Sequence, residues 1–166
     1  MPFDGFCKVD GIKGESTDDK HKDQIEILGF NHGVHQHVSA TASSAGGASI
    51  GRSEHDDFTI TKYVDASSAP LMQACASGKH LKDVTIELCR AGGDKLPYLE
   101  IKMEQVMVSH YIPSGHTKGD DGFPTETVNF NYGSIKYTYT QQKRADGGAG
   151  GKFMGGWDRT ANKVPS

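Results

Sequence analysis

The chain has 166 residues, a formal net charge of −3 and a hydrophobic share of 35%. This length suits one domain with a substantial buried core. Lysine and arginine are not gathered into a stripe, which argues against a nucleic-acid-binding surface or a basic membrane-surface segment. No apolar run is long enough to cross a bilayer, and the first residues lack the basic and apolar regions of a signal peptide. We therefore expect a single domain over residues 1–166 that starts as a soluble cytoplasmic protein.

The three cysteines, Cys7, Cys75 and Cys89, are odd in number and show no CxxC spacing. This pattern argues against a disulfide framework and against a zinc site. We expect three reduced thiols that pack as small apolar residues.

Apolar and polar residues alternate along most of the chain, which is the pattern of half-buried β-strands. The alternating segments are residues 25–27, 58–61, 84–88, 99–108 and 128–139. The phase slips by one residue at Glu104–Gln105, where we expect a β-bulge, and again at Gly133. The chain is thus predicted to be mainly β.

One segment, residues 67–78, breaks the alternation. It begins with cap residues, has Pro70 in its first turn and ends on Gly78. Leu71 and Cys75, four residues apart, share one face. We predict a short α-helix of about three turns that packs on the sheet.

Two stretches, residues 39–53 and 115–124, are rich in small or polar residues and predict long loops. The tail from about residue 145 is again rich in glycine. It then places Phe153, Met154 and Trp157 as apolar anchors, so we expect the tail to dock on another surface.

The histidines raise the possibility of a metal site, because His32, His35 and His37 fall within six residues. On a strand, His35 and His37 share a face while His32 points the other way. No HExxH motif supplies the third ligand that catalytic zinc needs. We interpret these residues as a polar strand face and expect no metal or other cofactor.

Other candidate motifs also lack the pattern that their chemistry requires. Ser114, His116 and residues 120–121 could be drawn as a triad, but no nucleophile elbow is present. Residues 147–153 resemble a phosphate-binding loop, yet Asp146 and Phe153 stand where the motif needs Gly and Ser or Thr. The acidic clusters lack EF-hand spacing. They comprise Glu15, Asp18, Asp19 and Asp23 in one group, and Glu54, Asp56 and Asp57 in the other.

Three stretches of the chain resemble a known family. They are residues 6–28, with Gly14-Glu15-Ser16 and His21; residues 58–79, the most specific; and residues 84–109, followed by the strand 127–139. In order and spacing these stretches are similar to the haemolysin-coregulated protein (Hcp) family, the tube subunits of the type VI secretion system.

The resemblance implies a two-sheet β-barrel-like body with one short flanking α-helix and an extended loop. It implies a non-enzymatic protein that forms homohexameric rings with a wide channel. Rings stack into a tube inside contractile sheath proteins and beneath a spike protein (VgrG). Sheath contraction ejects the tube, so the protein leaves the cell without a signal peptide, and the lumen carries or chaperones small effectors.

Two functional sites follow from the resemblance. The loop of residues 39–53 is expected to reach the neighbouring ring, through Ser43, Gly46, Gly47, Ile50 and Gly51. Asn31 is expected to contact effectors in the lumen. By strand alternation, Asn31 should share a face with Ile25, Ile27 and Gly29.

The residues alone leave two other interpretations open. One is a monomeric binding module that presents the two long loops to a partner. The other is a hydrolase that uses the histidines to hold a metal.

Overall fold

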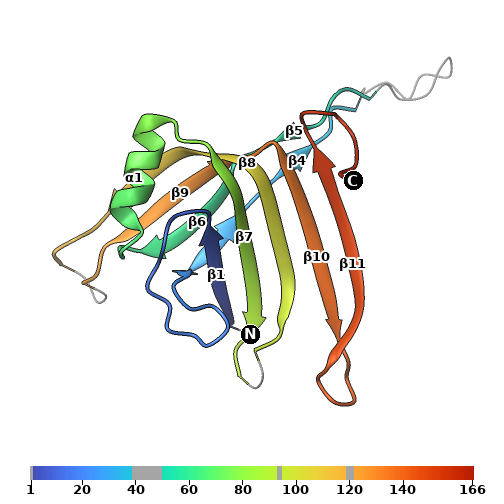
Figure 1. The fold of residues 1–166 in the computed structure, drawn as a ribbon, viewed down its shortest axis with the longest axis horizontal. Coiled ribbons are helices and arrows are strands. Elements are labelled where there is room, and N and C mark those ends of the chain that lie inside the picture. Colours follow the sequence, from blue (N-terminus) through green and yellow to red (C-terminus); the bar gives the residue numbers. More distant parts are fainter. Residues whose placement is uncertain (1, 39–49, 93–94, 119–121) are drawn as a thin grey trace.

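The computed structural model describes residues 2–38, 50–92, 95–118 and 122–166. They form a mainly β structure with one helix (Figure 1), as the alternation predicted. The strands are β1 (Phe3–Val9), β2 (Ile25–Ile27), β3 (Gly29–Asn31), β4 (Val34–His35), β5 (Glu54–His55), β6 (Phe58–Tyr63), β7 (Leu81–Arg90), β8 (Pro97–Ser114), β9 (Thr125–Asn131), β10 (Ser134–Gln142) and β11 (Ala149–Asp158); the helix is α1 (Ser68–Ser77).

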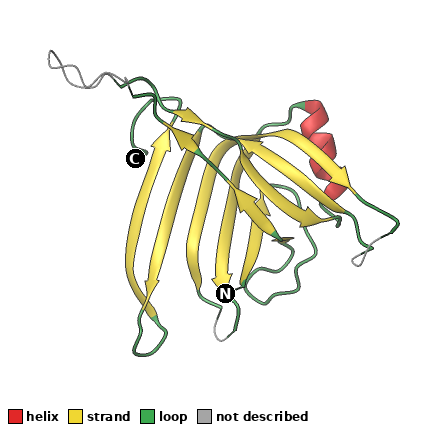
Figure 2. Ribbon diagram, turned by 180° about the vertical axis from the view of Figure 1, so that it is seen from behind, coloured by secondary structure: helices red, strands yellow, loops and turns green. Residues whose placement is uncertain are grey.

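Two antiparallel sheets share the long strand β8. Its first half pairs with β7 and β10, and its second half pairs with β9. The first sheet therefore runs β2-β1-β7-β8-β10-β11, and the second runs β8-β9-β6-β3. Figure 2 shows the two sheets curving around a common interior without closing into a complete barrel. The predicted barrel-like pair of sheets is confirmed.

The shared strand bends where the sequence pattern slips. Gln105 has a φ of 54°, a left-handed value that non-glycine residues seldom adopt, and both Glu104 and Gln105 are exposed. Opposite this bend, the Gly133 N–H donates to the carbonyls of Glu104 and Gln105 at 3.0 and 3.1 Å. A Cβ on Gly133 would lie 3.0 Å from the Gln105 Cβ, so any larger residue here would crowd Gln105.

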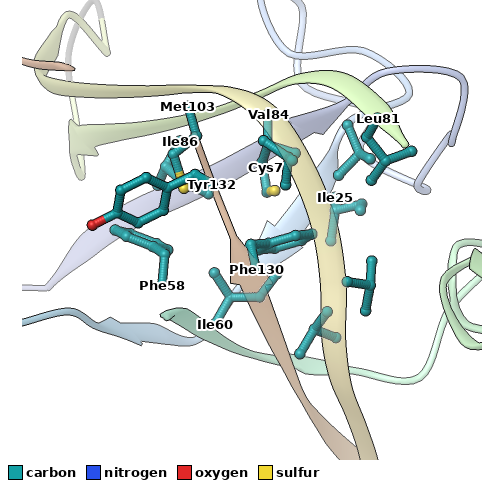
Figure 3. Close-up of a cluster of buried hydrophobic side chains, with 14 of the residues drawn as sticks. Cys7, Ile25, Phe58, Ile60, Leu81, Val84, Ile86, Met103, Phe130 and Tyr132 are labelled. Carbon is teal, nitrogen blue, oxygen red and sulfur yellow. The ribbon is translucent and has the colours of Figure 1, made fainter. Parts of the chain in front are cut away.

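The core lies between the sheets and is formed by inward-facing residues of nearly every strand (Figure 3). The rings of Phe58 and Phe130 have no exposed surface, and neither do Ile25, Ile60 and Met103. Burial of a large apolar side chain contributes about 1.5–3 kcal/mol. These contacts hold the two sheets together as one body.

The helix packs its Leu71 and Ala74 into this core. Its C-cap is Gly78, whose φ of 63° is left-handed, as the sequence predicted. At its start, Ser68 Oγ accepts a hydrogen bond from the Asp65 backbone N–H at 2.9 Å. Ser67 itself makes no side-chain cap.

The glycine-rich tail is more ordered than the sequence suggested. Residues 149–158 form β11, which pairs with β10 from Gln142 to Ser134. Among the expected anchors, Trp157 is half-buried, whereas Phe153 and Met154 are exposed. Strand β1 was not predicted either, because its apolar residues do not alternate cleanly.

Candidate functional site

The outward-facing side chains of β3, β6 and β9 in the second sheet are polar and uncharged. Asn31, Thr59 and Asn129 lie opposite one another across β3, β6 and β9. The Thr59 hydroxyl donates to the Asn129 side-chain carbonyl at 3.0 Å. Thr61 and Thr127 form the next pair. The strand neighbours of Thr59, Thr61, Thr127 and Asn129 are buried, which turns these polar side chains outward. We call Gly29 and these five residues the neutral face.

The outer face of the first sheet differs in charge. Lys8, Thr85, Lys102 and Lys136 lie opposite one another across β1, β7, β8 and β10. All three lysines are exposed. Rows of carboxylates flank these lysines, because Asp83 lies opposite Glu104 and Glu87 lies opposite Glu100. The same fold therefore presents one outer sheet face with charges of both signs and another on which β3, β6 and β9 carry no charge.

Asn31 lies at the edge of the neutral face and is exposed. Its predicted face is only partly right. It shares its side of the strand with Gly29, but not with the buried Ile25 and Ile27. Leu28 separates β2 from β3 and shifts the phase, so that Phe30 stacks on the buried Phe58 ring at 5.8 Å. The lumen contact of Asn31 stays a prediction.

The described part of the extended loop is its root, residues 34–38 and 50–56. Ile50 is 75% exposed and forms an isolated bridge with Val38. The Gln36 side-chain amide donates to the Gly51 carbonyl at 2.7 Å. The other three predicted loop residues, Ser43, Gly46 and Gly47, lie outside the described residues. The stacking role of the loop also stays a prediction.

Beneath the loop root, histidine and tyrosine side chains form one hydrogen-bonded chain. His32 Nδ1 lies 2.5 Å from the Tyr137 hydroxyl, and His32 Nε2 lies 2.6 Å from the Tyr132 hydroxyl. The Tyr132 hydroxyl also lies 2.7 Å from His55 Nδ1. These four residues, which we call the His–Tyr cluster, join the segment after β3 to β5, β10 and the β9–β10 turn.

The electrostatics of the His–Tyr cluster favour neutral rings. Burial lowers the pKa of His32 below its ordinary value, and the neighbouring His55 lowers it further. Burial likewise lowers the pKa of His55, with a further contribution from Arg159. A neutral imidazole has one N–H donor and one bare acceptor nitrogen. Each ring can therefore donate once and accept once along the chain.

The predicted histidine patch does not converge on one point. His32 belongs to the His–Tyr cluster, His35 Nε2 lies 3.0 Å from Asp56 Oδ2, and His37 Nε2 lies 3.1 Å from Glu54 Oε1. Within the part of the chain that the structure describes, no three potential metal ligands lie together. The residues present do not fit a catalytic metal centre.

The other candidate motifs are spread over turns and strand ends. Ser114 ends β8, His116 follows in an exposed loop, and residues 120–121 lie outside the described residues. The segment resembling a phosphate loop forms the turn before β11 and the first part of that strand. None of these segments leads from a strand into a helix, as a phosphate-binding loop requires.

The partners of His32 could not be predicted from the sequence. Tyr132, Tyr137 and His55 are distant in sequence, and only the fold brings them together. The one local signal was Tyr132 itself, because a tyrosine at an inward strand position needs a partner for its hydroxyl.

Helix α1, the one helix among the described residues, is not long and apolar enough to span a membrane. The fold and surfaces define a class: a two-sheet, barrel-like protein with one helix, a neutral sheet face and an extended loop. Residues 6–139 match the family described as type VI secretion system effector, Hcp. The chain belongs to this Hcp family.

Individual relatives agree with that assignment over nearly the full length. The protein Hcp1 of Pseudomonas aeruginosa is 34% identical over 163 residues, which cover 98% of each chain. A solved structure described as a type six secretion system protein superposes with a TM-score of 0.92 at 36% identity, covering 99% of this chain and all of the other. Hcp1 from Salmonella typhimurium gives a TM-score of 0.82 at 33% identity, with the same coverage.

Proposed function

We propose that this chain is a structural subunit of the type VI secretion tube. Six copies form a ring, rings stack inside the contractile sheath beneath the spike protein (VgrG), and contraction ejects the tube. The observation that carries this proposal is the Hcp family match over residues 6–139, together with a fold that superposes along the whole chain on a type six secretion system protein.

The two flanks of the sheet body support a ring. A closed ring of identical subunits uses a head-to-tail contact, so each subunit needs two different surfaces that fit one another. At one flank, β11 pairs only with β10 and presents an open strand edge among the described strands. At the other flank, β2 and β3 are short and end their sheets. The flanks are thus unlike each other.

The neutral face supports a lumen wall. A conduit for proteins of varied charge needs a wall that is polar yet binds none of them strongly. Thr59, Thr61, Thr127 and Asn129 meet that need, because they offer hydrogen bonds without net charge. We place Asn31 at the edge of this wall and assign it the effector contact.

The loop root supports contact with the next ring. Exposed Ile50 and Gly51 lie at the base of the extended loop, and the loop would carry Ser43, Gly46 and Gly47 to the neighbour. The subunit acts without catalysis or cofactor. It waits in the cytoplasm and leaves the cell with the tube, through the secretion route for which the family is named.

Electron microscopy of the purified protein tests the ring and its lumen together. In a Cys75→Ser background, a gold-tagged maleimide on Asn31→Cys should place density inside annular particles. The same tag on Lys102→Cys, on the exposed face of the first sheet, should lie outside the lumen. Particles without a central hole exclude the ring, and annular particles with the Asn31 tag outside exclude the assigned wall.

A further inference from the structure

At the loop end of the second sheet lies a pocket of about 900 Å³ whose lining includes two arginines. Arg52, His55, His80 and Arg159 line it, beside the indole of Trp157. We call this surface the arginine end. No local sequence pattern indicates this surface, because Arg52 and Arg159 are 107 positions apart.

Both guanidinium groups at the arginine end are held in place by backbone carbonyls. Arg52 donates through Nη2 to the Arg159 carbonyl at 2.6 Å, and Arg159 donates through Nη1 to the Tyr132 carbonyl at 3.0 Å. The Arg159 guanidinium also lies 5.5 Å from the centre of the Tyr132 ring. These contacts position the groups and leave most of their five N–H donors available.

Within residues 2–38, 50–92, 95–118 and 122–166, no carboxylate forms an ion pair with either arginine. The one acid that lines the pocket, Glu54, pairs with His37 at 3.1 Å. Arginine pairs held in a concave pocket favour carboxylate or phosphate groups. Among the described residues, the arginine end thus holds two arginines and one carboxylate, Glu54, which contacts neither arginine closely enough to form an ion pair.

The opposite end of the same sheet carries the complementary charge. Glu15, Glu26 and Asp65 line a pocket of about 330 Å³ with the rings of Tyr63 and Phe123. The two rings pack edge to face at 5.9 Å and are 43% and 58% exposed. We call this surface the acidic end. Glu15 and Glu26 are exposed and form no ion pair with any described cation.

The strands fix the two ends on opposite sides of the subunit. His55 comes just before β6, and Tyr63 ends that strand; Phe123 comes just before β9, and Asn131 ends it. Strands of this length separate their ends by about 20 Å. Figure 1 shows the loop root on one side and helix α1 on the other.

We propose that the arginine end of one copy binds the acidic end of a second copy, with Arg52 paired to Glu15 and Glu26. The contact is head-to-tail, so it repeats along a stack of copies. Arg52 directly follows Gly51 at the root of the extended loop, so the proposed contact lies at the loop end of the subunit. The inference rests on the proposed tube function and names the ionic contact between its subunits.

Crosslinking tests the contact directly. In the Cys75→Ser background, cysteines are placed beside the charged groups, which stay intact: Gly51→Cys next to Arg52, and Thr17→Cys in the pocket that Glu26 also lines. The chain with both cysteines should give multimers with a short bis-maleimide, and each single-cysteine chain should yield at most dimers. As a matched control, Arg144→Cys replaces Gly51→Cys, because Arg144 is exposed in the β10–β11 turn; that pair should give none of the longer products. Annular particles without the Gly51–Thr17 product overturn this inference and leave the proposed function standing, whereas monomers without rings overturn both.

Charge reversal gives a second readout. Arg52→Glu or Glu26→Arg should raise the concentration needed for half-assembly of copies through this contact by about tenfold, and the chain with both changes should recover most of that loss. Arg144→Glu should leave it within about twofold. The proposal is overturned if the double variant needs as high a concentration for half-assembly as the two single effects added together would predict. Binding of inorganic phosphate that requires Arg52, with assembly unchanged by Arg52→Glu, overturns it in favour of a small-anion site.

Discussion

The second sheet is held differently at its two ends. At the helix end, the buried Lys62 ammonium pairs with the buried Glu126 carboxylate and, at 2.9 Å, with Asp65. Glu126 also accepts from Ser68 Oγ at 2.7 Å and from the Tyr111 hydroxyl. At the loop end, the His–Tyr cluster joins the strands through groups that are neutral in their favoured form.

The two ends therefore differ in the kind of group that joins the elements. At the helix end, a buried ion pair with additional hydrogen bonds links β6 and β9 to the start of helix α1. Imidazole rings change charge between about pH 5 and 8. The loop root, through which we propose that subunits meet, is thus the end that responds to acid.

The largest effect is expected from Lys62→Met. This change leaves Glu126 as a buried charge without its main partner, which costs about 3–5 kcal/mol. Chemical denaturation of the variant should show that loss, and the double variant Lys62→Met/Glu126→Leu should regain part of it. The exposed control Lys102→Met should change stability by less than about 0.5 kcal/mol. A Lys62→Met loss below about 1 kcal/mol contradicts a strong helix-end network.

A smaller loss is expected at the loop end. Tyr132→Phe removes the hydroxyl shared by His32 and His55, and we expect it to cost about 1–3 kcal/mol. Tyr139→Phe is the matched control, because Tyr139 is 41% exposed. Equal denaturation midpoints for the two variants would show that the shared hydroxyl contributes nothing.

Acid should weaken the loop end in a defined window. His32 and His55 have folded pKa values below their ordinary value of 6.5, so the unfolded chain takes up their protons first. Their contribution to the free energy of unfolding is complete above pH 6.5 and is lost as the pH falls through the lowered pKa values. Melting temperatures measured from pH 7.5 to 5 should fall for the wild type and for His116→Gln. The fall in melting temperature should be smaller for the double variant His32→Gln/His55→Gln. If the melting temperature of this variant depends on pH as steeply as that of the wild type, the His–Tyr cluster does not cause the acid sensitivity.

Asp18 titrates in a separate, more acidic window. Its hydrogen bond to His21 and its pairing with Lys95 lower its pKa to about 2. Its contribution to the free energy of unfolding is present above the ordinary aspartate pKa of 3.8 and is lost as the pH falls toward 2. This loss cannot be confused with that of the histidines.

The smallest effect is expected at the exposed pair between His35 and Asp56, whose side chains are both 60% exposed. His35→Asn should change stability by about 0–1 kcal/mol, because solvent and salt screen such pairs. Denaturation at low and high salt measures this contribution. A loss as large as that of Tyr132→Phe would mean that the loop root depends on its surface pairs rather than on the buried cluster.

Much of the fold was predictable because local patterns record it. The alternation over residues 84–88 and 99–108 and the glycine after the helix each appear in the structure. The burial pattern slips at Gln105, which has a left-handed φ, but the register shift in the second half of β8 lies between Val108 and His110 rather than at the predicted bulge. Strand β11 was not predictable in this way. Its glycines leave no apolar period to read, and its place is set by pairing with β10.

The functional surfaces were harder to predict, because they form across strands. The neutral face depends on the register that sets Thr59 opposite Asn129. The arginine end depends on the return of the tail to the loop root. The sequence correctly placed Asn31 on the same face as Gly29 but wrongly placed it with Ile25 and Ile27. The break at Leu28 is not visible in the alternation of a three-residue strand.

Native mass spectrometry of the purified full chain shows whether six copies form a ring. We expect a dominant species with the mass of six copies, which persists on dilution through the micromolar range. A spectrum that contains only the single chain under the same conditions contradicts the ring, and with it the tube.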